Sequence, residues 1–131
     1  MAQIQVSIVT PETTIYDSPA ESVVVPLIDG EKGILPGHAS MIARLGPGEL
    51  RVTNGGSIDS FYVDGGFVQI SKDSVSVLPG SSIPTAEIDL SKAKADLEAA
   101  QSQAADNPEL MEIKQKAIAQ ANAQIRLAER S

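Results

Sequence analysis

Residues 58–71 read IDSFYVDGGFVQIS, two short apolar runs on either side of an Asp64-Gly65-Gly66 turn. β-Branched and aromatic residues are typical of strands, and glycine accepts the positive φ that a tight turn needs. The stretch therefore predicts two antiparallel strands joined as a hairpin.

The same pattern continues on both sides of this stretch. Ile4, Val6 and Ile8 alternate with polar residues, and so do Val75 and Val77. Further turns are predicted at residues 46–48 (GPG) and 54–56 (NGG). Strands that bury one face and recur every eight to ten residues or so indicate a small antiparallel β-sandwich or flattened barrel, here over residues 1–84.

Composition changes abruptly at Pro84. All ten glycines precede it, whereas twelve of the sixteen alanines follow it. A helix is predicted directly after this junction, because apolar residues recur there at steps of three and four, with Asp89 as its N-cap. The members of this apolar stripe are Leu90, Ala93, Leu97, Ala100 and Ala104.

A second helix is predicted after Asn107-Pro108, where Asn107 can cap and Pro108 suits the first helical position. Its apolar stripe comprises Leu110, Ile113, Ala117, Ala121, Ile125 and Ala128. At 100° per residue, Lys116, Arg126 and Arg130 lie together on the opposite side. Residues 85–131 are thus expected to form an antiparallel helical hairpin, which makes the fold class α+β.

Charge and composition exclude several classes of function. The formal charge of −7 argues against nucleic acid as a partner, and the absence of cysteine excludes disulfides and thiolate metal sites and favours a reducing compartment. No apolar run approaches the eighteen residues or so of a membrane span, and no signal or transit segment is visible before the first predicted strand. We therefore expect a soluble chain.

Catalytic motifs are also missing. His38 is the only histidine, and the carboxylates are scattered along the chain. A histidine-based metal site or a triad would have to be built on this single imidazole, so we predict no catalytic residues and no metal site. An enzyme remains the minority hypothesis, and it would require a deep polar pocket that converges on His38.

One loop and several motifs in order carry a family resemblance. The loop is Gly30–Ala39, GEKGILPGHA; after it come Leu45-x-Pro47-Gly48-x-Leu50, Val63-x-Gly65-Gly66-Phe67, Val77-Leu78 and the Ile88-Asp89 start of the alanine-rich segment. This ordered set resembles the epsilon subunit of bacterial F-type ATP synthases over nearly the whole chain.

The resemblance implies a non-catalytic rotor subunit that couples proton flow to rotation. Its sandwich would bind the gamma subunit and the c-ring, with Glu31, Lys32, Gly33 and His38 in the contact. His38 is equally compatible with satisfying only its own loop. The basic residues Lys116, Arg126 and Arg130 would meet the catalytic beta subunits, next to alpha, and restrain ATP hydrolysis. Such a subunit is peripheral to the bacterial inner membrane, on its cytoplasmic side.

Regulatory ATP binding is a further property of some members of this family, and here the sequence departs from their motif. The positions concerned are Ile88, Asp89, Lys92 and Arg126, and Lys92 stands where ATP-binding relatives carry arginine. Lysine lacks the planar fork of a guanidinium, so we expect ATP binding to be weak or absent and no other cofactor. We favour Asp89 as a helix cap.

Two alternatives stay open. A free-standing β-sandwich adaptor would explain the fold and the missing chemistry, although not the ordered motifs. For the hairpin, packing through alanines gains about 0.8 kcal/mol per buried methyl against about 1–2 kcal/mol for each ordered backbone residue. We therefore expect a weakly docked, mobile hairpin; the alternative is a close-packed alanine hairpin that never moves.

Overall fold

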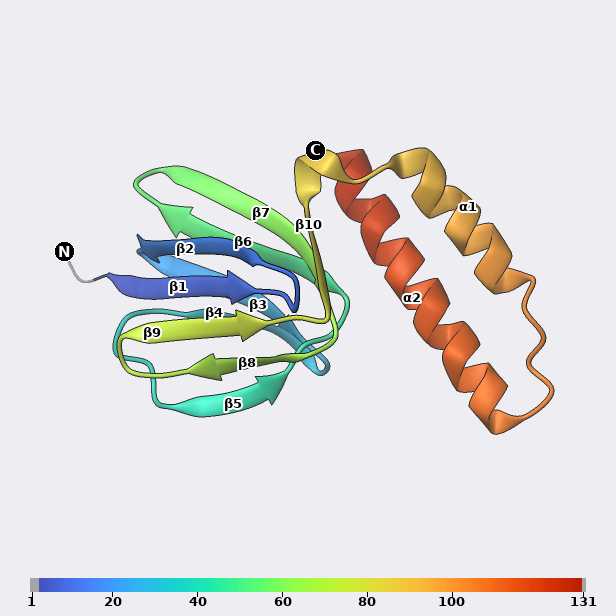
Figure 1. Cartoon of the computed structure of the whole chain (residues 1–131), viewed down its shortest axis with the longest axis horizontal. Coiled ribbons are helices and arrows are strands. Elements are labelled where there is room, and N and C mark those ends of the chain that lie inside the picture. Colours follow the sequence, from blue (N-terminus) through green and yellow to red (C-terminus); the bar gives the residue numbers. More distant parts are fainter. Residues whose placement is uncertain (1–2, 131) are drawn as a thin grey trace. The chain divides into compact units, whose positions relative to one another are not determined.

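The computed structural model describes residues 3–130, with side chains to Glu129. The backbone divides into two compact units, Met1–Ile83 and Pro84–Ser131. The first is a β-sandwich and the second is helical (Figure 1), so the predicted α+β fold is confirmed.

Two five-stranded sheets form the sandwich. The first has the order β2-β1-β9-β8-β5, and the second has the order β10-β7-β6-β3-β4. The strands are β1 Ile4–Val9, β2 Thr14–Ala20, β3 Ser22–Leu27, β4 Gly30–Ile34, β5 Met41–Arg44, β6 Gly48–Asn54, β7 Ser57–Asp64, β8 Phe67–Ile70, β9 Ser74–Leu78 and β10 Ser81–Pro84.

A single apolar core fills the space between the sheets. Alternate residues of the strands supply it, as the sequence predicts for Ile4, Val6 and Ile8 and for Val75 and Val77. One pairing differs from the predicted antiparallel pattern: β1 and β9 run parallel, with Val6 opposite Val75. The N-terminal strand is thus placed inside its sheet, between β2 and β9.

The predicted hairpin at Asp64-Gly65-Gly66 is wrong. β7 pairs with β6, whereas β8 pairs with β5 and β9, so the chain crosses from one sheet to the other at this turn. Both glycines do have positive φ, 68° and 78°. The real hairpin is one turn earlier, where Gly55 and Gly56 connect β6 to β7 and Asn54 pairs with Ser57.

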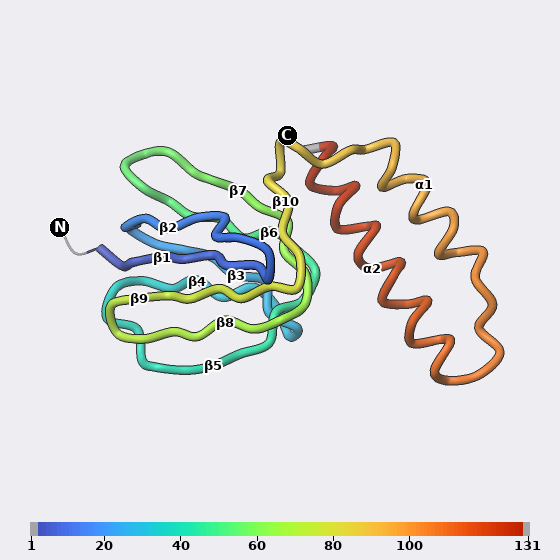
Figure 2. The backbone as a smooth tube through the Cα atoms, in the orientation of Figure 1, coloured from blue at the N-terminus to red at the C-terminus, as the bar shows by residue number. Residues whose placement is uncertain are grey.

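Gly66 is required at its position for a steric reason as well. A Cβ there would collide with the carbonyl oxygen of Leu78 and lie 2.9 Å from the Cα of Pro79. Leu78 and Pro79 begin a later passage of the chain between the sheets, from β9 to β10. The Gly80 amide also donates to the carbonyl of Asp64 at 3.0 Å, so the two crossings are bonded to each other. Figure 2 shows the path of the backbone through both.

The helical unit begins with a short 3-10 helix, η1 Thr85–Glu87, and continues with α1 Leu90–Gln101 and α2 Pro108–Arg130. The two long helices contact each other and run antiparallel (Figure 1). Both predicted caps are confirmed: Asp89 Oδ1 accepts from the Lys92 amide at 3.1 Å, and Asn107 Oδ1 accepts from the Leu110 amide at 2.8 Å.

The predicted apolar stripes are only partly correct. Ala93, Ala100 and Ala121 are buried, but α1 ends before Ala104. In α2, Ile113 is 58% exposed, whereas Ala123 and Leu127, which the prediction left out, are each 2% exposed. The buried arc of α2 is therefore wider than one stripe near its C-terminal end, and it is absent near Pro108.

Replacing Gly66 by alanine should destabilise the sandwich by about 3 kcal/mol. The added methyl group would collide with backbone atoms of Leu78 and Pro79, and the φ of 78° is unfavourable for an L-residue. Chemical denaturation of the full chain measures this loss. Gly33→Ala is the matched control, since a Cβ at Gly33 meets nothing within 4 Å and the φ there is not positive. Equal losses in both variants would contradict the steric argument.

Replacing Asp89 by alanine should destabilise the hairpin by about 1 kcal/mol, because the first turn of α1 loses its cap. Asp89→Asn keeps a capping oxygen and should lose little. Thermal unfolding followed by far-UV circular dichroism compares the two, with Asn107→Ala as the equivalent change in α2. A similar loss in the asparagine and alanine variants would mean that the charge matters rather than the cap.

Candidate partner-binding surfaces

Three of the four residues expected to contact partners lie in the edge strand β4. Glu31 and Gly33 are on one face of the second sheet, and Lys32 is on the other, because neighbouring residues of a strand alternate. Gly33 is a regular strand residue opposite Val24. Residues 30–34 of the segment Gly30–Ala39, which the sequence predicts as a loop, are therefore a strand, and Gly33 does not bend the chain.

His38 lies beyond β4, after a turn that the structure ties down. Gly37 has a φ of 87°, and its amide donates to the carbonyl of Lys72 at 2.9 Å, in the turn between β8 and β9. Nδ1 of His38 lies 2.6 Å from the carbonyl oxygen of Ala39. The turn is thus held by a backbone hydrogen bond to the β8–β9 connection, and Gly37 is the residue at which the chain bends. The local bond of His38 fits the hypothesis that it satisfies its own loop.

A charged group joins β6 to β4 on the outer face of the second sheet. Arg51 Nη1 lies 2.8 Å from Glu49 Oε1 and 3.3 Å from Glu31 Oε2. The second oxygen of Glu49 accepts a hydrogen bond from Ser60 Oγ at 2.6 Å. The hydrogen bond to Glu49 is the largest cause that raises the pKa of Arg51, and burial opposes it. Sequence reasoning missed this group, because its members are scattered along the chain.

A second feature that sequence reasoning missed is an exposed apolar cluster around Arg44, which we call the Arg44 patch. Ile42 and Phe67 lie on the outer face of the first sheet and are 68% and 45% exposed. Ile28, 67% exposed, has its amide bonded to the carbonyl of Arg44 at 3.2 Å. Exposed apolar side chains gathered in one place are typical of protein-binding surfaces.

The predicted basic face of α2 is solvent-accessible. Lys116 and Arg126 are both exposed, as expected from their position opposite the apolar stripe. Arg130 ends the helix, and its side chain lies outside the described residues.

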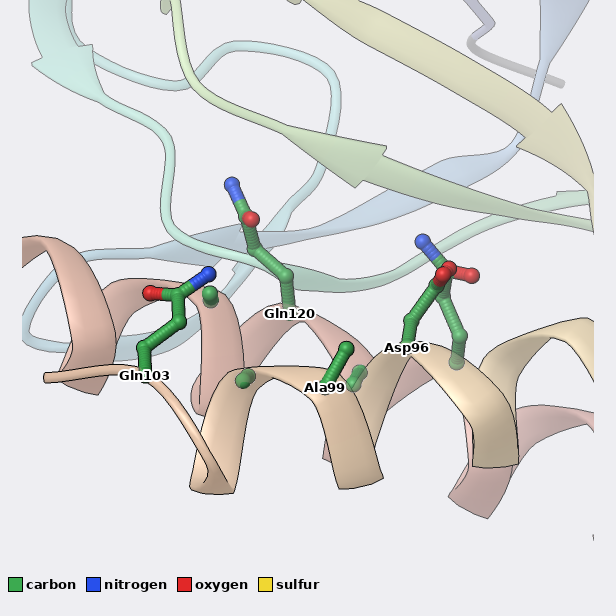
Figure 3. Close-up of a pocket in the computed structure, with 8 residues that line it drawn as sticks. Asp96, Ala99, Gln103 and Gln120 are labelled. Carbon is green, nitrogen blue, oxygen red and sulfur yellow. The ribbon is translucent and has the colours of Figure 1, made fainter.

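A shallow groove of about 280 Å³ runs between α1 and α2. Figure 3 shows Asp96 from α1, Gln103 from the segment just after α1 and Gln120 from α2 projecting to one side of it, with Ala99 below them. Its volume is at the lower limit of small-molecule sites, which span about 300–1,000 Å³. The lining offers amides and one carboxylate but no cation, so the groove is poorly suited to a phosphate group.

None of the four residues of the doubtful nucleotide site lines the groove between α1 and α2. Asp89 Oδ1 is engaged as the cap of α1, and Lys92, which supplies the capped amide, has an exposed side chain. Arg126 belongs to the opposite helix, and Ile88 precedes the cap. The antiparallel order brings Lys92 and Arg126 to the same end of the hairpin (Figure 1).

Two further features of residues 3–130 bear on the type of site. No helix in this range is both long and apolar enough to cross a membrane. Within the same range, no group of three or more histidine, cysteine, aspartate or glutamate side chains could hold a metal ion.

Comparisons with known proteins identify relatives of this chain. Residues 3–84 match the family model described as ATP synthase, Delta/Epsilon chain, beta-sandwich domain. The chain is 40% identical over 123 residues to the ATP synthase epsilon chain of Rhodopirellula baltica, covering 94% of this chain and 96% of that one. It is 32% identical over 131 residues to the sodium-ion-specific epsilon chain of Propionigenium modestum, covering 98% and 96%.

Solved structures share the fold. A chain in the Euglena gracilis mitochondrial ATP synthase, in a structure of OSCP, F1 and c-ring, superposes with a TM-score of 0.85 at 24% identity, covering 100% of this chain and 83% of that one. A chain in the Tetrahymena thermophila central stalk and c-ring gives 0.72 at 14% identity, with 95% and 96% covered. By its family model and its near full-length relatives, this chain belongs to the ATP synthase epsilon-chain family.

Proposed function

We propose that the chain is a central-stalk rotor subunit of a bacterial F-type ATP synthase, coupling ion-driven rotation of the c-ring to ATP synthesis through gamma. The observation that carries this is the match to epsilon chains over both units, 94% of the chain for the Rhodopirellula relative. A free-standing adaptor would share the sandwich, but it gives no reason for the matching helical hairpin.

The sandwich is the proposed site of the gamma and c-ring contacts. The exposed edge strand β4 presents Glu31 and Lys32, and the pinned turn at Gly37 presents His38. The Arg44 patch adds exposed apolar area beside a cation, which suits a protein partner. We assign the apolar patch to gamma and the charged β4 strand with its loop to the rotor surface that gamma shares with the c-ring.

The hairpin is proposed to restrain ATP hydrolysis by contact with the beta subunits, next to alpha. Lys116 and Arg126 are exposed on α2, so they are accessible to a partner surface. Contact with an acidic surface would desolvate these cations. The ion pairs formed there would then contribute more to the binding free energy than solvent-exposed ion pairs do.

The proposed rotor role also implies the catalytic status, cofactor need and location of the chain. The chain is non-catalytic, requires no cofactor, and lies at the cytoplasmic side of the bacterial inner membrane as a peripheral component. Regulatory ATP binding is not favoured, because Asp89 already caps α1 and lysine replaces the arginine of the binding motif.

The full chain should bind purified gamma, and Ile42→Ser should weaken this binding about tenfold, because an exposed isoleucine at an interface loses its buried apolar contact. Isothermal titration calorimetry measures the dissociation constants. Ile58→Ser is the matched control, since Ile58 is 61% exposed but lies in the other sheet, and it should bind as the parent does. Failure of the parent chain to bind gamma would favour the adaptor.

Changing Lys116, Arg126 and Arg130 together to alanine should raise ATP hydrolysis by the assembled complex about two- to tenfold, because the charged contact that restrains it is lost. The difference from the parent should shrink as salt rises, since charges are screened over about 8–10 Å at physiological ionic strength. Steady-state hydrolysis assays measure both effects. Lys94→Ala, an exposed lysine of α1, serves as the control. Unchanged hydrolysis at low salt would mean that the basic face is only solvated surface.

A further inference from the structure

Arg51 contacts residues on two strands that are not neighbours. Its Nη1 atom lies within 3.3 Å of both Glu49 on β6, its own strand, and Glu31 on β4. The side chains of Glu49, Arg51 and Glu31 are 9%, 33% and 54% exposed, so the group runs from a buried anchor to an accessible end. The contact with Glu49 is the shorter one, which fixes Arg51 from the buried side.

The sheet register explains how Arg51 reaches across. β3 lies between β6 and β4, and Val24 of β3 pairs with Arg51 on one side and with Gly33 on the other. This row ends in a glycine, so no side chain of β4 occupies the space over Val24. Glu31 is two residues from Gly33 and therefore projects from the same face.

Glu31 lies at a position of β4 where the ladder with β3 has no hydrogen bond, between two rows that are paired regularly. Glu31 pairs with Pro26, which has no N–H, and the carbonyl of Pro26 accepts from the Gly46 amide at 2.9 Å on the far side of β3. In an antiparallel ladder such a pair is not hydrogen-bonded, so the N–H and C=O of Glu31 point towards the free edge of the sheet. The side-chain contact with Arg51 is then the direct tie at this row.

We propose that Arg51 is a positioning residue for the rotor contact, which holds Glu31 and the free edge of β4 in the orientation that the partner meets. This inference rests on the proposed function, in which Glu31 contacts the rotor partners. A glutamate held before binding loses less side-chain freedom on association, so the tie contributes to affinity without Arg51 touching the partner.

The test is a double-mutant cycle in which every variant also carries Glu49→Gln. This background is used because removing Arg51 from the native chain would leave the buried Glu49 carboxylate without its cation. Arg51→Ala, Glu31→Ala and the combination are made in the full chain and titrated against a purified gamma–c-ring subassembly lacking this chain. Arg51→Ala should weaken binding about two- to fivefold, the range for exposed ion pairs, and should add nothing once Glu31 is alanine. Arg51→Lys should recover part of the loss.

Two controls separate positioning from folding. Gln5→Ala removes the Gln5–Asp17 hydrogen bond of 2.6 Å in the other sheet and should leave the dissociation constant unchanged. Thermal unfolding is recorded for every variant; if Arg51→Ala does not fold, Arg51→Lys beside the native Glu49 replaces it, because it keeps a cation but loses the fixed guanidinium geometry.

The outcomes separate the positioning role of Arg51 from the proposed function of the chain. Equal weakening by Arg51→Ala with and without Glu31, or tighter binding on loss of Arg51, would overturn the positioning role while leaving the proposed function intact. If Glu31→Ala binds as well as the parent, both the Glu31 contact and the role of Arg51 are overturned. Binding of gamma by the parent chain still tests the rotor assignment separately.

Discussion

The close approach of two chain crossings constrains how the two sheets are connected. At Gly66 the chain leaves the second sheet for the first, and at Pro79 it returns, with no room between the two for even a methyl group. The amide of Gly80 adds hydrogen bonds to the carbonyls of Asp64 and Gly65. Because β10 begins directly after this contact, the point at which the chain leaves the core towards the helical unit is fixed by backbone atoms.

The fold class and the element types follow from the sequence, but the strand partners do not. Asp64-Gly65-Gly66 correctly predicts positive φ, since that is a property of the glycines themselves. Whether a turn closes a hairpin or passes to the facing sheet depends on which strands are already paired. β7 pairs with β6 on one edge and with β10 on the other, so β8 pairs with β5 and β9 in the facing sheet. Local signals cannot encode that competition.

The same division applies to the candidate surfaces. Helix caps at Asp89 and Asn107 and the exposed cations of α2 could be predicted, because each depends on residues a few positions apart. The Arg44 patch could not, since the fold alone brings Ile28 and Phe67, which are distant in sequence, next to Arg44. The wide buried arc at Leu127 exceeds the single stripe that helical periodicity predicts, because periodicity reports one apolar face and not the full surroundings of a helix.

The parallel pairing of β1 with β9 has a consequence for synthesis. Val6 can find Val75 only after some seventy residues have been made, so the first strand waits through most of the sandwich before its central place in the sheet exists. Contacts of such sequence separation slow folding, because the chain must close a long loop before it gains them. The two helices follow β9 in the sequence, so every strand of the first sheet has been synthesised before the ribosome adds them.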